Sequence, residues 1–370
     1  MNKISELKSI LGESFTWNKA RLDCFARMLI ALFAVRTVNL SELAVGFGSK
    51  AQIRSRYIRL QRFFKQFIFD YNLIARWIFA LFFHDKQSIY LTIDRTNWFW
   101  GKAKINIFVL GVAYEGLAIP LFWHVLPKAG NSNVDEQMAL ISLFIKNFPH
   151  IDIAGLLADR EFANGPLFAW LKQQRVNFYI RIKEGSVLRI KKKKLITAKK
   201  LFKTVTAKHI SYPMSVWIFG QKLFATASRS ETGELMVVAT NAKPTIAIAV
   251  YLRRWEIECL FQSLKCRGFR FEDTHMTSVE RIEKLMTLLA IGFAWAHKVG
   301  EWCALHKKSI LFKRHRYSFR PQNNLFRHGF DFIRELILNP YRKAFHFQRC
   351  LLQLSSNNKT TLMNNQALAF

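Results

Sequence analysis

The middle of the chain consists of short apolar segments with two different periods. Between residues 88 and 125, apolar and β-branched residues form runs typical of strands, and Glu115-Gly116 predicts a tight turn. Beyond them, two segments with the 3.6-residue period of a helix each precede a short apolar strand. The predicted strands are Ser88–Ile93, Ile105–Tyr114, Leu117–Val125, Ile153–Ala158 and Phe178–Ile182, and the helices are Val134–Phe148 and Gly165–Gln174. The order β-β-β-α-β-α-β predicts an α/β fold with a mixed sheet.

The first 84 residues have mainly helical periodicity. Ser41–Val45 leads through Gly46 and Gly48 to a second helix, for which Ser49 is the predicted N-cap. A helical wheel separates the apolar and basic residues of this second helix. The apolar side holds Ile53, Leu60, Phe63, Phe64 and Phe67, the basic side holds Arg54, Arg59, Arg62 and Lys65, and Arg56 and Ile58 break the pattern. This arrangement favours a DNA-binding helix-turn-helix over an ordinary basic surface helix.

The rest of the chain is basic and β-like at first and then helical. Residues 184–245 contain the run Lys191–Lys194 and two β-rich segments, which predict an inserted β-rich subdomain. These segments are Val216–Ala227 and Leu235–Thr240, separated by the turn residues Ser230–Glu234. A frayed tail is expected from about Ser355. The predicted organisation is a helical DNA-binding region (1–84), the first part of an α/β core (85–183), the β-rich insertion (184–245), a helical completion of the core (246–305), and a basic C-terminal segment and tail (306–370).

The charge of the chain indicates its partners. There are 56 Lys and Arg residues against 25 Asp and Glu residues, a formal net charge of +31, which predicts a polyanionic partner. The apolar run Leu285–Trp295 is much shorter than the ~20 residues that span a bilayer. Residues 1–21 lack the apolar core of a secretory signal, and the five cysteines form no CxxC pair. We therefore expect a soluble protein of the reducing cytoplasm without a membrane partner.

Two aspartates are notable because acidic residues are scarce. Asp94 follows the apolar strand SIYLTI and opens the segment DRTNW, and Asp159 follows IAGLLA and opens DREF. Either aspartate alone is explained more simply as a turn or capping residue. A pair at matching positions is more informative, because open α/β sheets bind ligands at the carboxyl ends of their strands. Two converging carboxylates repel each other unless a cation lies between them, and Mg²⁺ prefers such oxygen ligands.

A third feature is the polar stripe of the segment YLRRWEIECLFQSLK. If Tyr251–Lys265 is one helix, four polar side chains lie within a sector of about 60°. They are Tyr251, Arg254, Glu258 and Lys265, while Ile257, Leu260, Phe261 and Leu264 supply the core. An acid between cations suits a metal-binding carboxylate flanked by phosphate-binding groups, although ordinary helix surfaces also carry mixed charges. Glu258 is preferred to Glu256, which points about 140° away from the direction of Tyr251.

Together these residues resemble the DDE transposases of bacterial insertion sequences, specifically the insertion sequence 4 family. The resemblance rests on the triad Asp94, Asp159 and Glu258 and on a Y-x₂-R-x₃-E-x₆-K signature. Tyr251, Arg254, Glu258 and Lys265 spell this signature. The likeness extends from about residue 88 to residue 300, and DRTNW and DREF strengthen it. It implies a ribonuclease H-like catalytic core, in agreement with the predicted strand order, with a β-rich insertion between the second Asp and the Glu.

The resemblance also implies a chemistry. Asp94, Asp159 and Glu258 would hold two Mg²⁺ ions, for which Mn²⁺ can substitute. Tyr251, Arg254 and Lys265 would contact double-stranded transposon-end DNA near the scissile phosphate. The protein would bind the terminal inverted repeats of its element and catalyse strand cleavage and transfer into target DNA (cut-and-paste transposition), as a homodimer on paired ends. Its location would be the nucleoid of a bacterial cytoplasm.

Hairpin intermediates occur in some members of that family, and they require an unstacked base. Trp217 in the insertion is a candidate stacking platform, although a core tryptophan is the preferred interpretation.

Other functions are compatible with parts of the sequence. A non-catalytic DNA-binding regulator would explain the charge and the helix-turn-helix, but not the carboxylates and the stripe. A metal-dependent DNA nuclease without strand transfer would use the same site, and a decayed transposase would keep the motifs without activity. The basic residues gather in the N-terminal helices, the insertion and the C-terminal segment. DNA binding should therefore fall steeply with salt.

Overall fold

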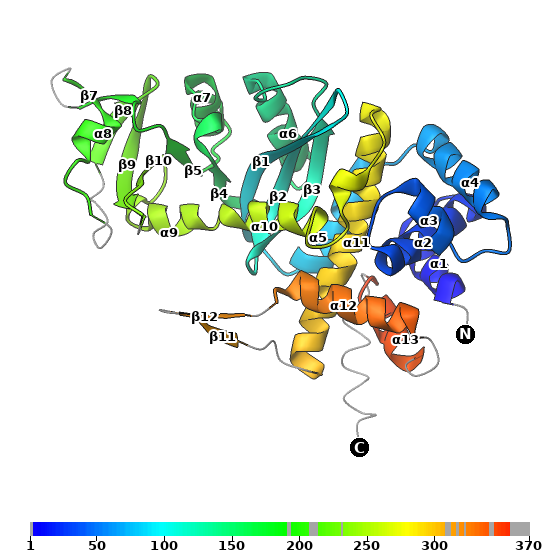
Figure 1. Ribbon diagram of the computed structural model, residues 1–370. Helices are drawn as coiled ribbons and strands as arrows, with labels where there is room; N and C mark the ends of the chain where they lie inside the picture. The colour runs from blue at the N-terminus through cyan, green and yellow to red at the C-terminus, as the bar shows by residue number, and fades with distance from the viewer. Residues whose placement is uncertain are drawn as a thin grey trace. The chain divides into compact units, whose positions relative to one another are not determined.

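The computed structural model of the chain describes residues 3–190, 194–206, 214–230, 232–307, 312–315, 318–321, 323–339 and 344–355. The chain divides into two compact units, whose elements are labelled in Figure 1. Unit 1 is Met1–His84, Trp98–Ile105 and Phe261–Phe370, and unit 2 is Asp85–Asn97 and Asn106–Leu260. Lys191–Lys193 and the predicted tail after Ser355 lie outside the described residues. The segment boundaries proposed from the sequence stay a prediction.

The core of unit 2 follows the predicted order of elements. These are β1 (Ser88–Trp100), β2 (Ala103–Tyr114), β3 (Leu117–Val125), α6 (Val134–Asn147), β4 (Asp152–Ala158), the 3-10 turn η1 (Arg160–Phe162), α7 (Gly165–Gln173) and β5 (Phe178–Ile182). The strands lie in the spatial order β3-β2-β1-β4-β5. β4 is parallel to both β1 and β5, and β3 is antiparallel to β2. The mixed α/β sheet and the ribonuclease H-like core are thereby confirmed.

The β-rich insertion continues this same sheet. Its elements are β6 (Val187–Arg189), β7 (Leu195–Thr197), α8 (Ala198–Leu201), β8 (Met214–Ile218), β9 (Gln221–Arg229) and β10 (Leu235–Thr240). β10 pairs with β5 in antiparallel fashion, so that β1 to β10 form one ten-stranded sheet ending in β10-β9-β8-β6-β7. The β-rich segment Val216–Ala227 contains a reversal between β8 and β9. Phe219 and Gly220 both have positive φ there, as in the type I′ turns that join hairpin strands.

Helices follow the insertion and complete the core. They are the 3-10 turn η3 (Pro244–Ile246), α9 (Ala247–Leu252) and α10 (Trp255–Leu264). Tyr251 of α9 joins Leu157 of β4 and Tyr179 of β5 in one buried cluster, so α9 covers that face of the sheet. On the other face, Phe168 of α7 stacks on Phe178 of β5 with ring centroids 4.8 Å apart. Because side chains alternate along a strand, every second residue of β4 counted from Leu157 points toward α9.

One predicted strand is longer than expected. Ser88–Ile93 was expected to end before Asp94, but β1 continues to Trp100, and Asp94 lies inside it. The physical reason is that TNWFW continues the β-prone pattern and forms a longer strand beside β2. The parallel pairing of β1 with β4 nevertheless stops at Thr92, opposite Leu157. Asp94 therefore lies just beyond the end of the parallel ladder, although it does not lie beyond the end of its strand.

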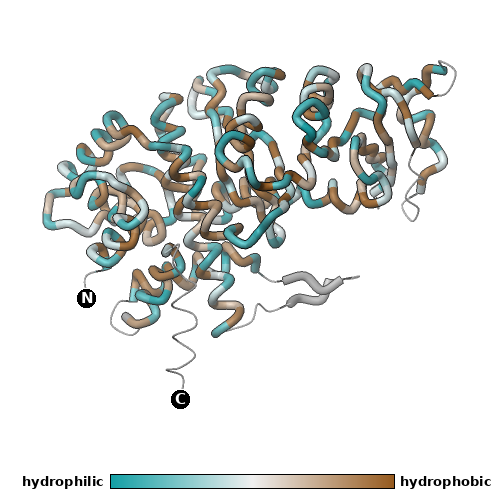
Figure 2. Tube along the Cα trace, turned by 180° about the vertical axis from the view of Figure 1, so that it is seen from behind, coloured by the Kyte–Doolittle hydropathy of each residue, from teal (hydrophilic) through white to brown (hydrophobic). Residues whose placement is uncertain are grey.

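Unit 1 is mostly helical, as predicted for its N-terminal part. Its helices are α1 (Lys3–Ser14), α2 (Lys19–Val35), α3 (Leu40–Gly46), α4 (Ile53–Gln66), α5 (Tyr71–Phe83), α11 (Val279–His306), α12 (Leu325–Leu338) and α13 (Ala344–Leu352), with the 3-10 turn η4 (Phe271–Asp273) and the antiparallel pair β11 (Phe312–His315) and β12 (Ser318–Pro321). Apolar and polar residues alternate along the helices in Figure 2, as expected for amphipathic elements. Leu60, Phe63 and Phe64 of α4 are buried, as the helical wheel predicts.

Two details of the predicted helix-turn-helix differ in the structure. The N-cap of α4 is Gln52 rather than Ser49, because residues 49–51 form part of the turn. Arg56 stabilises this turn by donating to the carbonyl oxygens of Ser49 and Ala51 at 2.5 and 2.7 Å. This explains why a cation interrupts the pattern of the helical wheel. Ile53 is 53% exposed and does not join the apolar side.

The core of unit 1 is aromatic and includes one close helix crossing. Trp295 is fully buried, packs edge-on against Phe33 and donates from Nε1 to the carbonyl of Cys350 at 2.8 Å. α11 and α12 approach each other at two glycines. A Cβ on Gly300 would collide with the backbone carbonyl of Leu325 in α12. A Cβ on Gly329 would collide with a backbone carbonyl of α11. Only glycine allows the two backbones to come this close.

Among the described helices, none is by itself long and apolar enough to cross a membrane. The pair α2 and α3 passes by length and composition when taken together, with a bend of 100° between them.

Candidate active site

Asp94 and Asp159 lie level with each other on neighbouring strands of unit 2. Thr92 of β1 pairs with Leu157 of β4, and the backbone stays extended at Asp159, just after β4. Continuing that register by two residues on each strand brings Asp94 and Asp159 to the same level of the two strands. Asp94 and Asp159 each lie an even number of residues from a residue of β1 or β4, respectively, whose side chain faces α9. The two carboxylates therefore project from the same face of the sheet.

A buried ion pair joins the segments that follow the two aspartates. Arg95, next to Asp94, donates from Nε and Nη2 to the two carboxylate oxygens of Glu161, at 2.8 and 2.7 Å. The same guanidinium donates to the side chains of Asn106 and Asn131, at 3.1 and 2.8 Å. Such a planar fork fixes direction as well as distance. Arg95 and Glu161 thus hold DRTNW and DREF together, a link that no pattern in the sequence indicates.

The segment that carries Glu258 is not the single continuous helix that the helical wheel assumes. α9 ends at Leu252, Arg253 and Arg254 form a turn, and α10 begins at Trp255. In the break, the amides of Arg254 and Ile257 donate to carbonyls three residues back, instead of four. The tighter turn changes the direction of the chain, so the stripe calculated at 100° per residue does not describe it. Tyr251, Arg254 and Glu258 still converge on one place, but the break contributes to that convergence.

Contacts link all three carboxylates to this segment. The Tyr251 hydroxyl donates to Asp159 Oδ1 at 3.3 Å. Arg254 binds Asp94 Oδ2 through Nη1 at 3.3 Å and Glu258 Oε1 through Nη2 at 2.5 Å. Glu256, the alternative acid, instead pairs with Arg253 at 3.2 Å. The geometry thus brings Glu258, rather than Glu256, to the aspartates.

Burial and charge tune these groups. Burial raises the pKa of the Asp94 carboxyl to about 7, although the Arg95 amide and the Arg254 guanidinium act in the opposite direction. Burial also raises the pKa of Tyr251 to about 12, so that its hydroxyl keeps its proton and can donate to Asp159. Burial opposes the charge of Arg254, but Tyr251 and Glu258 outweigh it and raise the pKa of the guanidinium further. Arg254 is therefore a permanent cation between two carboxylates, and its Nε has no hydrogen-bond partner among the described residues.

The chemistry of these donors fits a hard divalent cation. They are carboxylate oxygens without sulfur or imidazole, the set that Mg²⁺ and Mn²⁺ prefer. In the part of the chain that is described, no three acidic, His or Cys side chains converge closely enough to hold a metal ion directly. The Arg254 guanidinium is instead the cation between Asp94 and Glu258, with side-chain exposures of 11, 18 and 31% for the three residues. The two carboxylates thus have a positive charge between them, which the protein itself supplies.

Lys265, the last residue of the signature, follows the end of α10 and belongs to unit 1. Its ammonium pairs with Glu272 Oε1 at 2.9 Å and lies 5.0 Å from the ring centroid of Trp98. The expected contact of Lys265 with DNA stays a prediction.

The four cations expected to bind DNA on α4 differ in their surroundings. Arg54, Arg62 and Lys65 are exposed. Arg59 is half-buried and donates to Asp23 Oδ2 and to the carbonyl of Ala20, both at 3.0 Å. Part of its charge is therefore neutralised within unit 1. Their role in DNA binding stays a prediction.

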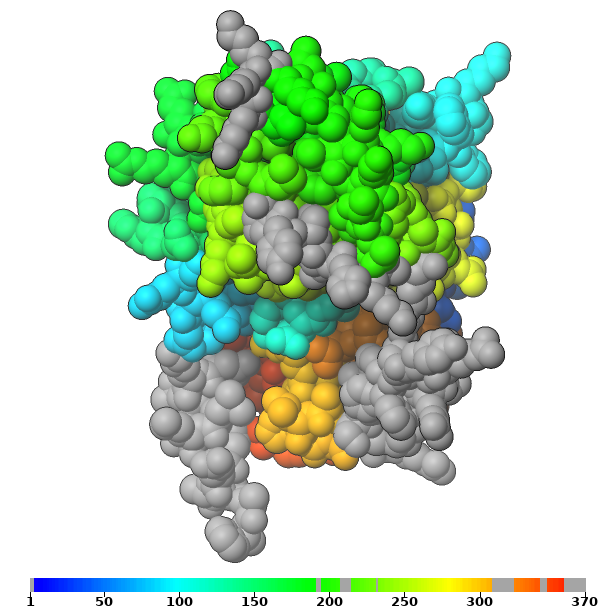
Figure 3. Space-filling view, turned by 90° about the vertical axis from the view of Figure 1, so that its left-hand side faces the viewer, coloured from blue at the N-terminus to red at the C-terminus, as the bar shows by residue number. Residues whose placement is uncertain are grey.

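Trp217 lies on the surface, and its interpretation as a core tryptophan is wrong. It is 41% exposed, and Arg189 of the neighbouring strand β6 covers its ring at 4.5 Å from the centroid. Phe224 of β9 lies on the same face of the sheet as Trp217 and is 38% exposed. Figure 3 looks onto the end of unit 2 that the insertion strands form, in green. Alternation along β8 was the signal that could have shown this, because Val216 and Ile218 on either side of Trp217 are buried.

Comparison with known proteins identifies the class of this fold and site. Residues 82–293 match the family model of the transposase DDE domain, and the chain belongs to that family. Among solved structures, a cryo-electron microscopy structure of the piggyBac transposase synaptic complex with hairpin DNA is similar, with 12% sequence identity and a TM-score of 0.42. The alignment covers 95% of this chain and 82% of that chain. No curated protein matches the sequence.

Proposed function

We propose that this protein is a cut-and-paste DNA transposase of the insertion sequence 4 type. It would bind the terminal inverted repeats of its element and catalyse Mg²⁺-dependent strand cleavage and strand transfer. The observation that carries the proposal is the convergence of Asp94, Asp159 and Glu258 around Arg254 and Tyr251. Membership of the DDE transposase family supports it.

The three carboxylates would have the same role in strand cleavage and in strand transfer. Asp94, Asp159 and Glu258 would hold two divalent ions, which when bound lower the pKa of the attacking water or 3′-hydroxyl and stabilise the leaving 3′-oxygen. Strand transfer differs from hydrolysis only in the nucleophile, so one site serves both. Tyr251 orients Asp159 through its hydroxyl. Arg254 would neutralise phosphate charge with its planar fork, for which it must first leave Asp94 and Glu258.

The remaining parts of the chain support DNA as the substrate. The net charge of +31 suits the gathering of two DNA ends, and we propose that a homodimer does so in the bacterial cytoplasm, at the nucleoid. Trp217 and Phe224, exposed among cations on the sheet of unit 2, would offer stacking surfaces to an unpaired base.

A cleavage assay tests the proposed function. Inverted repeats are first sought in the DNA that flanks the gene, and labelled duplexes carrying them are then incubated with the protein and Mg²⁺. We expect both cleaved ends and products joined to target DNA. Cleavage without any joined product, with Mg²⁺ or Mn²⁺, would instead indicate a nuclease, and binding without cleavage would indicate a regulator.

Removing exposed cations from α4 should weaken DNA binding without affecting catalysis directly. For Arg54→Ala/Arg62→Ala, we expect the slope of log K against log salt to become shallower by about 1.8, since each phosphate contact contributes about 0.9. Lys146→Ala/Lys172→Ala, on α6 and α7 of unit 2, is the matched control and should leave the slope unchanged. Fluorescence anisotropy of labelled duplex at several salt concentrations measures both. Equal slopes for the α4 variant and wild type would rule out this part of the proposal.

A further inference from the structure

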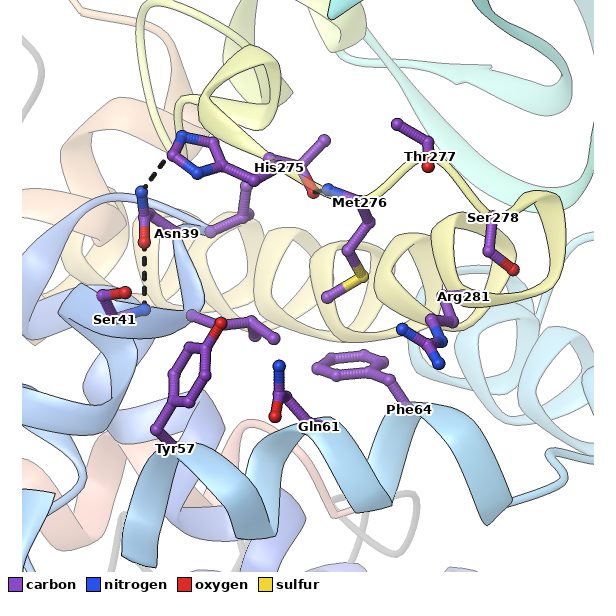
Figure 4. Close-up of a pocket in the computed structure, with 13 residues that line it drawn as sticks. Asn39, Ser41, Tyr57, Gln61, Phe64, His275, Met276, Thr277, Ser278 and Arg281 are labelled. Carbon is purple, nitrogen blue, oxygen red and sulfur yellow. Dashed lines mark hydrogen bonds between the residues drawn. The ribbon is translucent and has the colours of Figure 1, made fainter. Parts of the chain in front are cut away.

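A small pocket within unit 1 is separate from the carboxylate site. It has a volume of about 180 Å³ and lies between α3, α4 and the segment 274–278 that precedes α11 (Figure 4). Its polar lining comes from three parts of the sequence. The residues that matter here are Asn39, Ser41, Tyr57, Gln61, Met276 and Arg281. The family match ends at residue 293 and assigns no role to this pocket.

One face of α4 supplies a wall of the pocket. Tyr57, Gln61 and Phe64 are spaced at i, i+4 and i+7, and in Figure 4 they rise from the helix toward Met276 and Arg281. Neither the Tyr57 hydroxyl nor the Gln61 side-chain amide makes a hydrogen bond to a described residue, and Gln61 is exposed, so both polar groups are free to meet a ligand. Arg54 lies on the same face of α4, one turn before Tyr57 and seven residues before Gln61. Besides the cations expected to bind DNA, α4 thus contributes neutral polar and aromatic side chains to a pocket.

The opposite wall combines a cation with an organised polar edge. Arg281 lies in the first turn of α11 and forms no ion pair with the described residues. Asn39 accepts from the amide of Ser41 at 2.9 Å and lies 3.4 Å from His275 Nε2, which fixes its side-chain amide at the rim. The lining contains no Asp or Glu. A ligand with a negative charge next to a neutral polar group therefore meets no carboxylate in the lining, although the charge of the neighbouring Glu280 also acts on Arg281.

The size of the pocket restricts the ligand. Its 180 Å³ equals the liquid volume of about six water molecules and is below the range of about 300–1,000 Å³ of drug-sized sites. A helix or a strand of a partner protein does not fit, whereas a single ring system does. Phe64 and Met276 are 1% and 9% exposed and form the apolar floor of the pocket, whereas the half-buried ring of Tyr57 offers a face to such a ring system. The amides of Asn39 and Gln61 offer a donor and an acceptor each to its edge.

The surroundings within unit 1 favour nucleic acid as the source of that ring. Trp100 stacks on His275 at the rim, with ring centroids 4.1 Å apart and an angle of 16° between the planes. Phe99 is 64% exposed next to it in sequence, and Lys104 lies over its ring at 5.4 Å. Aromatic rings interleaved with cations are the surfaces on which proteins bind unpaired bases.

We propose that this pocket binds one unpaired nucleotide, with the base against the ring of Tyr57, the base edge on Gln61 and the phosphate on Arg281. The inference rests on the proposed function insofar as the nucleotide belongs to a DNA strand. A free nucleotide has the same chemistry and is the other possible source. The pocket would recognise a nucleotide that is unstacked at a bulge or a strand end.

The test compares binding of two duplexes that differ by one unpaired nucleotide. One contains a single bulged 2-aminopurine, whose fluorescence reports stacking, and the other is fully paired. Wild type should bind the bulged duplex about tenfold more tightly, within the range of 1–3 kcal/mol per stacked base. Gln61→Ala and Arg281→Ala should each remove most of that preference while they still bind the paired duplex. Gln173→Ala, an exposed glutamine on α7, is the matched control and should keep it.

The outcomes separate this inference from the proposed function. The 2-aminopurine mononucleotide alone serves as the second probe, and its binding without any preference for the bulged duplex would assign the pocket to a free nucleotide. Equal affinities of wild type for both duplexes, together with no binding of the mononucleotide, would overturn the inference. So would pocket variants that keep the full preference. Because the readout is binding rather than cleavage, a protein that never cuts DNA can still show the preference.

Discussion

Asp94→Asn and Asp159→Asn are expected to bind transposon ends as tightly as wild type and to cleave them roughly 10³-fold more slowly or worse, as when one member of a catalytic unit is lost. The side chains of asparagine and aspartate have the same shape, so folding should be preserved. The amide cannot supply the negative charge that holds a divalent cation. Gel shift and single-turnover cleavage of the same labelled duplex separate binding from chemistry.

Asp152→Asn is the matched control for these two variants. Asp152 begins β4, at the end of the strand remote from Asp159, and accepts from the Ser88 hydroxyl at 2.6 Å. It is exposed, so its loss should change neither cleavage nor binding by a large factor. Wild-type cleavage by Asp94→Asn would show that the carboxylates do not carry the reaction.

Arg254→Gln should destabilise the protein, and divalent cations should restore part of the loss. Its removal leaves Asp94 and Glu258 without their shared cation in a mostly buried site, and breaking buried pairs of this kind costs about 3 kcal/mol or more. A bound ion stabilises by about 2.7 kcal/mol at a hundredfold excess over its Kd. We therefore expect Mg²⁺ to raise the free energy of unfolding more in Arg254→Gln than in wild type, where the ion must displace the guanidinium. Urea unfolding with and without Mg²⁺ measures this difference.

Two variants make this result specific. Arg254→Lys keeps a point charge and should lie between wild type and Arg254→Gln. Arg253→Gln removes the adjacent arginine, which pairs with Glu256 and the carbonyl of Ala113. Any destabilisation of Arg253→Gln should be the same with and without Mg²⁺. If Mg²⁺ affects all of these proteins equally, Arg254 does not occupy a cation position.

The fold of the core could be predicted because its signals are local. Each strand of the sheet from β1 to β5 is a short apolar segment, and the order of elements then leaves few topologies. Asp159 follows the end of its strand as the same pattern predicts, whereas Asp94 lies inside β1, beyond the end of its parallel pairing with β4. The resemblance of Tyr251, Arg254 and Glu258 to a family signature identified the residues that the structure brings to the aspartates.

The rest depends on long-range contacts that no local pattern contains. The pair Arg95 and Glu161 is separated by 66 residues, and only the parallel pairing of β1 and β4 brings it together. The break at Arg253 and Arg254 has no Gly or Pro to indicate it, so a wheel treats the segment as one helix. Trp217 was assigned to the core by residue type alone, whereas its neighbours on β8 determine its face.

Metal rescue of Glu258→Cys tests most directly whether the three carboxylates bind the catalytic cations. Glu258 is partly exposed on α10, so a cysteine should be tolerated there. A thiolate binds Mg²⁺ poorly but is a good ligand for softer ions, above all Zn²⁺. We predict that Glu258→Cys binds DNA ends like wild type, fails to cleave them in Mg²⁺, and regains measurable cleavage in Mn²⁺ or Zn²⁺. Cleavage in Mg²⁺ at the rate of wild type, or inactivity in every metal by a variant that folds and binds DNA normally, would contradict the account.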